Sequence, residues 1–195
     1  MKTRISIALV IALTLVGCTA LQNAYQMTKC EYTYNSISNV KVMGIDFSTL
    51  SATALITAIP KITKVLKGDF TEMPIEMTVN LNVKNPDTKK NASVADLQYA
   101  INIDDIDIAS GKLGKSFNVD PGKTSVLPVV VKTDLCNVLK SDNRDKIVGI
   151  VKNFTGISSD KSTIKLKVKP VLMSDKNKKV TLPEVPLTFK YNGKK

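Results

Sequence analysis

The sequence predicts a mainly β protein, an antiparallel β-sandwich of about seven or eight strands with two amphipathic helical segments. Apolar residues make up 43% of the 195 residues, which is enough for the core of one domain. Apolar and polar residues alternate in several segments, as they do in strands that bury one face. Turn-forming residues separate these segments. The sequence therefore predicts a folded sheet protein rather than a disordered chain.

The N-terminus has the pattern of an export signal. Residues 1–4 carry two positive charges, and residues 5–16 are mostly apolar. This stretch is shorter than the roughly 20 residues of a transmembrane helix and fits a secretory signal. It ends in Leu15-Val16-Gly17-Cys18, which resembles the bacterial lipobox. We therefore expect residues 1–17 to be a lipoprotein signal peptide. An ordinary signal peptide followed by a chance cysteine is the alternative.

Cys18 is the expected lipid anchor. In lipobox proteins this cysteine is acylated, and acyl chains attach a protein to a membrane at ~0.8 kcal/mol per buried methylene. Thr19 follows it instead of Asp, which by resemblance to lipoprotein sorting favours the outer membrane of a Gram-negative cell envelope. We expect residues 18–29 to be the lipidated cysteine and a tether. Residues 30–195 then form a single sandwich domain.

Two further cysteines, Cys30 and Cys136, belong to the exported part of the chain. An oxidising compartment permits a disulfide between them. Two separate buried thiols fit the sequence equally well, because the sequence does not give the distance that a disulfide requires. A metal site built from two cysteines without histidine is not expected.

The charge of the chain bears on its partners. The formal net charge is +11, lysine supplies most of it, and aromatic residues make up 5%. Nucleic-acid binding more often uses arginine forks and aromatic stacking, so no nucleic-acid partner is expected. Dispersed lysines indicate a solvated surface. A membrane, reached through Cys18, is the expected partner, with anionic lipid or envelope proteins as further candidates.

The first predicted elements follow the tether. Segments 30–34 and 40–47 alternate as strands do. Residues 48–67 change to apolar spacings of three and four, which indicates one face of a helix. Pro60 lies inside this segment and is expected to kink or divide the helix.

Residues 73–83 form the clearest strand, with alternation over eleven positions. The sequence Asn85-Pro86-Asp87 ends it with strong turn residues. Segments 97–103 and 106–109 alternate again, on either side of a turn at Asp104-Asp105.

The C-terminal half continues this pattern with one interruption. Short and long strands are predicted at 116–119 and 125–132, and Pro128 predicts that the second is an edge strand or carries a bulge. Residues 134–154 return to helical spacing, with Asp134 as the N-cap. Strands at 164–172 and 185–191 complete the sheet, the first with a row of outward lysines that protects against edge aggregation.

Residues that could carry chemistry are few. The chain has no histidine, which excludes histidine general bases and Ser-His-Asp triads. Asp104, Asp105 and Asp107 could supply oxygen ligands to calcium, but the loop lacks EF-hand spacing. A hairpin turn is the preferred interpretation. We therefore expect no enzyme, no metal and no cofactor.

One segment carries an ordered set of motifs. It runs through Val79-Asn80-Leu81-Asn82-Val83-Lys84-Asn85-Pro86-Asp87, Leu97-Gln98-Tyr99, Ile108-Ala109-Ser110-Gly111 and Val126-Leu127-Pro128-Val129-Val130-Val131. This order resembles the type 2 late embryogenesis abundant family and its WHy (water stress and hypersensitive response) domain. Asp87 replaces the usual final Asn, and Asp105 stands where the family commonly has Gly. The resemblance covers residues 77–132 and extends over about 70–192.

The resemblance implies an immunoglobulin-like or fibronectin-III-like sandwich with a small helical cap. It implies structural roles for five motif residues: Asn85, Pro86, Tyr99, Gly111 and Pro128. It also implies a non-enzymatic, membrane-anchored lipoprotein that protects against desiccation or envelope stress. The alternative is a binding module or carrier for an apolar ligand such as a lipid, held between the sheet and the two helical segments.

Overall fold

The structure is a computed structural model that describes residues 21–47, 72–139, 143–173 and 179–193, and the single positions 58, 60, 63 and 67. Residues 21–27 are helical. The strands and helices after them are β1 (Glu31–Val42), β2 (Ile45–Asp46), β3 (Pro74–Lys84), β4 (Ala92–Val94), β5 (Asp96–Ile103), β6 (Ile106–Lys112), β7 (Phe117–Val119), β8 (Thr124–Asp134), η1 (Leu135–Val138), α3 (Arg144–Phe154), β9 (Ser162–Met173), β10 (Lys179–Thr181) and β11 (Val185–Tyr191).

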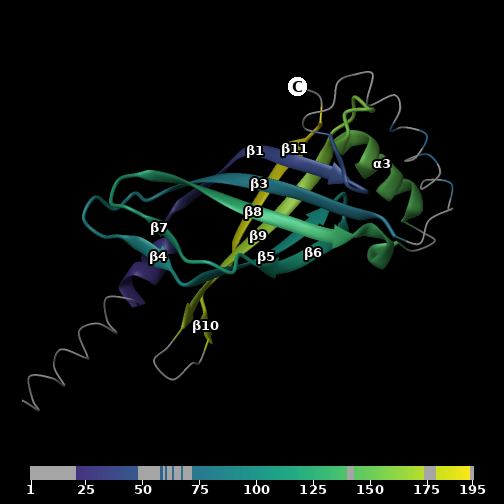
Figure 1. Cartoon of the computed structure of the whole chain (residues 1–195). Helices are drawn as coiled ribbons and strands as arrows, with labels where there is room; N and C mark the ends of the chain where they lie inside the picture. The colour runs from purple at the N-terminus through teal and green to yellow at the C-terminus, as the bar shows by residue number, and fades with distance from the viewer. Residues whose placement is uncertain are drawn as a thin grey trace, which may run out of the picture.

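Two antiparallel sheets form the sandwich (Figure 1). One sheet has the order β2-β1-β3-β8, and the other has the order β10-β9-β5-β6 with β11 also paired to β9. β4 and β7 pair separately. Among the described residues, seven strands are at least seven residues long. The predicted mainly β, antiparallel sandwich is therefore confirmed.

Alternation along the long strands builds the core between the sheets. On β3 and β9 every second side chain is buried, and the residues between them face outward. The buried set is at most 1% exposed and comprises Met77, Val79, Leu81, Val83, Ile164, Leu166 and Val168. Outward positions carry amides on β3 and lysines on β9, as the sequence predicted.

The two open sides of the sandwich differ. Pro128 predicted either an edge strand or a bulge, and the structure has the edge: among the described residues β8 pairs with β3 alone. Pro128 has no N–H to leave unpaired there. On the other side the rings of Tyr34 (β1) and Phe189 (β11) stack with centroids 4.3 Å apart and an interplanar angle of 16°.

The first strand differs from the prediction of two separate segments. β1 is one strand that bends at two register shifts, between Tyr34 and Ser36 and between Ser38 and Lys41. Asn39 takes a positive φ of 54° at the second shift, a conformation that Asn tolerates better than most residues. Four of the five residues between the two predicted strands are polar, with Ile37 the exception, so alternation alone did not reveal that the strand continues.

The second predicted helical segment is present in two parts, η1 and α3. Asp134 caps η1, because its Oδ1 accepts hydrogen bonds from the backbone N–H of Cys136 (2.9 Å) and of Met73 (2.8 Å). α3 buries its apolar side against the sandwich: Ile147, Ile150, Val151 and Phe154. The predicted helix at 48–67 lies outside the described residues, except for Ala58, Pro60 and Thr63, which are helical.

The N-terminal helix packs on the sandwich. Within residues 21–27, Ala24 and Met27 are fully buried and Gln26 is 5% exposed. The described part of the expected tether is therefore joined to the core of the domain. The signal peptide and Cys18 lie outside the described residues. In the part of the chain that the structure describes, no helix is both long and apolar enough to span a bilayer.

Candidate functional site

Three segments meet at one end of the sandwich, which we call the anchor end: residues 21–31, 84–90 and 120–124. The strand registers bring them together, since Lys84 lies opposite both Glu31 and Thr124. Figure 1 shows the 21–27 helix on the opposite side of the molecule from α3 and the C-terminus. The anchor end is therefore the part of the fold nearest in sequence to Cys18.

Asn85 holds the anchor end together. Its side chain is fully buried. Its Nδ2 donates to the carbonyls of Lys90 (2.8 Å) and Val119 (3.2 Å). Its Oδ1 accepts from Gln26 Nε2 (3.1 Å) and from the backbone N–H of Asp87 (3.1 Å). One amide thus joins the N-terminal helix, the turn after β3 and the strand β7.

Charged residues surround this amide on the surface. Asp87 accepts hydrogen bonds from the backbone N–H groups of Lys89 and Lys90, which hold the pKa of its carboxyl below its ordinary value. Gly122 N–H donates to the carbonyl of Asp87 (2.8 Å), which ties the two turns together. Pro86 is exposed and lies two residues beyond Lys84, the last residue of β3, where a residue without an N–H does not interrupt the ladder.

The outer side of the N-terminal helix carries two large apolar residues beside the exposed Gln22. Leu21 and Tyr25 are 56% and 54% exposed, and their spacing of four places them on one helix face. The ammonium of Lys29 lies 4.8 Å from the centroid of the Tyr25 ring. The helix therefore presents an apolar pair, with a cation beside it, on the face opposite its buried residues.

Tyr99, Gly111 and Val130 link the two sheets at the β8 edge. Tyr99 on β5 lies opposite Gly111 on β6, and its hydroxyl donates to the carbonyl of Val130 on β8 at 3.0 Å. A Cβ at Gly111 would lie 2.7 Å from Tyr99 Oη and 2.8 Å from Cζ. Only glycine leaves room for the ring there. Burial also raises the pKa of Tyr99.

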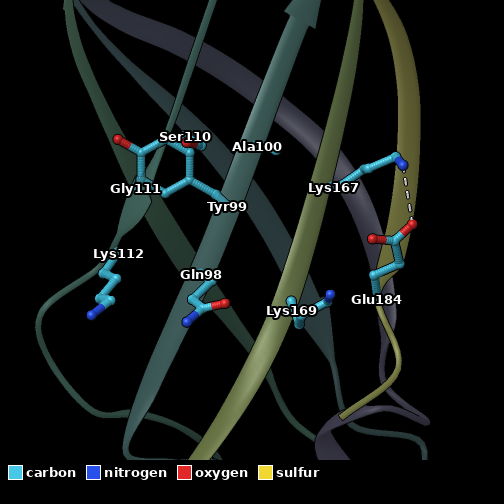
Figure 2. A pocket seen from close by; sticks show the side chains of 9 residues that line it. All are labelled: Gln98, Tyr99, Ala100, Ser110, Gly111, Lys112, Lys167, Lys169 and Glu184. Atoms are coloured by element: carbon cyan, nitrogen blue, oxygen red, sulfur yellow. Dashed lines mark ion pairs between the residues drawn. The ribbon is translucent and has the colours of Figure 1, made fainter. Parts of the chain in front are cut away.

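The outer face of the β6-β5-β9 sheet has a shallow hollow of about 360 Å³ beside Tyr99 (Figure 2). Lysines at its rim include Lys167, which pairs with Glu184 at 3.1 Å. The residues that line it are Gln98, Tyr99, Ala100, Ser110, Gly111, Lys112, Lys167, Lys169 and Glu184. It is an open, basic surface without a buried polar group aimed into it.

The interior offers little room beside α3. The cavity between β1, β3 and α3 has a volume of about 10 Å³ and is lined by apolar residues such as Val42, Met77 and Phe154. A single water needs about 10–15 Å³. This cavity is therefore too small for a lipid chain.

Cys30 and Cys136 are separate free thiols. They flank opposite ends of β3, because Glu31 pairs with Lys84 and Pro74 pairs with Asp134. Eleven residues of strand span about 35 Å, while a disulfide needs Cα atoms about 4.4–6.8 Å apart. Of the two alternatives open in the sequence, the structure has the unbonded one. Burial raises the pKa of each thiol to about 11, and at Cys136 the Asp134 carboxylate adds to this effect.

The clustered aspartates form a turn. Asp104 and Asp105 have φ values of 49° and 67°, as a two-residue hairpin of type I′ requires. Asp104 accepts from Thr163 N–H at 2.7 Å, and Asp105 pairs with Lys165 at 2.6 Å. The hydrogen bond and charge of Lys165 lower the pKa of Asp105. Within the described residues no three potential ligands gather to hold a metal ion.

Two residues of the anchor end were not predicted. Gln26 and Met27 were assigned to a tether, although Ala24, Met27 and Cys30 repeat at a spacing of three. That spacing is the helical signal that could have revealed them. Three apolar positions were too few to distinguish a short packed helix from a polar linker.

Comparison with known proteins gives likenesses of fold. No protein-family model matches the chain, and no curated protein matches it. Similar solved structures include a crystal structure of a protein from Archaeoglobus fulgidus, with 13% identity, a TM-score of 0.37, and 83% of this chain and 98% of that one covered. A solution structure of a protein from Arabidopsis thaliana has 14% identity and a TM-score of 0.40, over 60% of this chain and 70% of that one.

A third similar structure carries a name that the sequence resemblance also gave. It is a solution structure provisionally named as a late embryogenesis abundant (LEA) protein. It has 12% identity and a TM-score of 0.42, over 97% of this chain and 87% of that one. The structural neighbours of this chain thus include a protein of the late embryogenesis abundant type.

Proposed function

We propose that this chain is a non-catalytic lipoprotein of the cell envelope that shields nearby membrane or protein surfaces during drying or envelope stress. The lipobox and Thr19 place Cys18 in the outer membrane of a Gram-negative envelope in this proposal. The observation that carries it is the position of the N-terminal helix, which is packed into the sandwich and whose first described residue, Leu21, lies three residues after Cys18.

The short link between Cys18 and Leu21 limits how far the domain can move from the membrane. Consecutive Cα atoms are about 3.8 Å apart, so three steps from Cys18 to Leu21 reach at most about 11 Å. A domain attached in this way stays at the membrane surface and does not sample the wider compartment. Such a position suits a protein that acts on the membrane itself or on its immediate neighbours.

The roles of the polar residues support the non-catalytic part. General acid-base chemistry at neutral pH most often uses histidine, which this chain lacks. The buried amide of Asn85 makes its hydrogen bonds with turn and strand backbone groups. The aspartates of the β5–β6 turn hold that turn to β9.

Two measurements test the proposal. Mass spectrometry of the N-terminal peptide from envelope fractions should show acyl chains on Cys18, and Cys18→Ala should release the protein from membranes. The acylated chain, reconstituted in liposomes and dried, should reduce leakage on rehydration more than an equal mass of an unrelated lipid-anchored sandwich domain. Equal leakage with the two proteins would contradict the protective role. An unmodified Cys18 would contradict the proposed anchor.

A further inference from the structure

The anchor end has an exposed apolar pair next to the expected lipid. Leu21 and Tyr25 project from the same helix face and are both more than half exposed. Ala24 and Met27 on the inward side are fully buried, so the helix cannot turn its apolar pair inward without emptying the core. Tyrosine is enriched at membrane–water interfaces because its ring is apolar and its hydroxyl is polar.

Lysines lie beside this pair and on the turns that Asn85 joins to its helix. Lys29 lies beside the Tyr25 ring, and Lys89, Lys90 and Lys123 are exposed on the turns joined to the helix through Asn85. Asn85 N–H donates to the carbonyl of Lys123 at 2.9 Å. Hydrogen bonds through Asn85 therefore hold the helix and both turns together at one end of the fold, which carries the apolar pair and these cations.

The carboxylates of the same end are engaged elsewhere. Asp87 accepts from two backbone N–H groups of its own turn, and Glu31 pairs with Lys84 at 3.3 Å. Asp120 accepts from Asn118 Nδ2 at 2.9 Å. The cations at this end thus outnumber the acids, and the acids are committed to holding the turns.

We infer that the anchor end docks on an anionic lipid surface, with Leu21 and Tyr25 in the headgroup region and Lys29, Lys89, Lys90 and Lys123 over the lipid phosphates. The inference rests on the proposed acylation of Cys18, and it adds an orientation to the proposed function. An acyl anchor within about 11 Å of Leu21 brings this surface to the bilayer. Charge and apolar contact then favour one orientation of the domain over free rotation about its link.

The basic hollow beside Tyr99 is a weaker candidate for this contact. It lies on the outer face of a sheet, and Lys165 and Lys167 at that face are paired with Asp105 and Glu184. It has no exposed apolar pair beside its lysines. These lysines therefore supply a matched control for the lysines of the anchor end.

The absence of tryptophan from the chain makes a direct test available. Tyr25→Trp introduces a single fluorescent reporter at the proposed contact, and Ile157→Trp introduces one at an exposed position after α3. The acylated full chain is reconstituted in vesicles of phosphatidylcholine, or of phosphatidylcholine with phosphatidylglycerol, with bromine on the acyl chains. Docking predicts a blue-shifted, strongly quenched Tyr25→Trp signal and an unquenched Ile157→Trp signal.

Charge variants test the lysines. Removing one lysine near an anionic surface weakens docking about five-fold. Lys89→Gln/Lys90→Gln/Lys123→Gln should therefore lower the ratio of docked to undocked protein about 100-fold in anionic vesicles. Quenching of Tyr25→Trp should then fall to the level seen in phosphatidylcholine alone. The control Lys165→Gln/Lys167→Gln/Lys169→Gln should leave the quenching unchanged.

The outcomes separate the docking from the anchor. If the chain floats with vesicles but Tyr25→Trp is quenched no more than Ile157→Trp, the docking is wrong and the anchor stands. If both lysine triples reduce quenching equally, the contact is not specific to the anchor end, and the inference is again wrong. If the chain neither carries acyl groups nor floats, the proposed anchor fails and the docking fails with it.

Discussion

Removing the Asn85 amide should loosen the whole anchor end. Asn85→Ala deletes four hydrogen bonds, to Gln26, Asp87, Lys90 and Val119. It also leaves the Gln26 amide, which is 5% exposed, without its partner in a buried site. A lost hydrogen bond costs about 1 kcal/mol, and an orphaned buried partner costs more. We expect a loss of about 3–4 kcal/mol in the free energy of unfolding, or about 10 °C in Tm.

Urea unfolding followed by circular dichroism measures this loss. The matched control is Asn82→Ala, which removes an amide on the exposed face of the same strand with one hydrogen bond, from Asn35 (2.8 Å). We expect the control to change the free energy of unfolding by less than about 1 kcal/mol. If Asn85→Ala cost no more than Asn82→Ala, the assignment of Asn85 as the structural link of the anchor end would be refuted.

Three further predictions concern other parts of the fold. Gly111→Ala should destabilise the protein by about 1–3 kcal/mol, and Tyr99→Phe by about 1 kcal/mol; an added Cβ would lie 2.8 Å from Tyr99 Cζ, which Tyr99→Phe keeps, so Gly111→Ala should also destabilise the Tyr99→Phe variant, and a neutral effect there would contradict the close contact. Cys30 and Cys136 should react with a disulfide reagent at pH 8 on the order of 100-fold more slowly than an ordinary thiol, and an intact mass that shows a disulfide would contradict the topology. At Asp134 burial opposes ionisation, but hydrogen bonds from the backbone outweigh it and lower the pKa below its ordinary value. The stability from this carboxylate is therefore present above about pH 4 and is lost as the pH falls through the lower folded pKa. Asp134→Asn should lose less stability than the natural chain between about pH 5 and pH 2.5, and equal acid profiles would exclude this role.

Local patterns predicted the strands because each strand buries one face. Residues 73–83 alternate without a break, and β3 follows them from Pro74 to Lys84. Pro128 predicted an edge because a residue without an N–H fits a ladder only where no partner strand follows, and β8 is an edge strand. These inferences needed only near neighbours in the sequence.

Features that depend on partners distant in sequence could not be predicted from local patterns. The Asn85 side chain bonds to Gln26 and Val119, which are 59 and 34 residues away in sequence. The residues near Asn85 do not indicate these partners. Whether Cys30 could meet Cys136 depended on which strand separates them, and that strand is β3. The N-terminal helix was taken for a tether because its burial comes from the turns it touches, not from its own composition.

Protection of the strand edges at the two open sides of the sandwich matters most for a protein that is held at a membrane surface, as proposed here. In the proposed lipid-anchored state, copies of the protein would share a plane, so their local density would be high and they would meet in similar orientations. Exposed strand edges would then pair from copy to copy and grow into fibres. The Val130 carbonyl is occupied by Tyr99, Pro128 offers no donor, and the Tyr34–Phe189 stack covers the other side. A crowded layer of such domains can therefore stay a layer of individual molecules, including when water is withdrawn and the distances between them shrink.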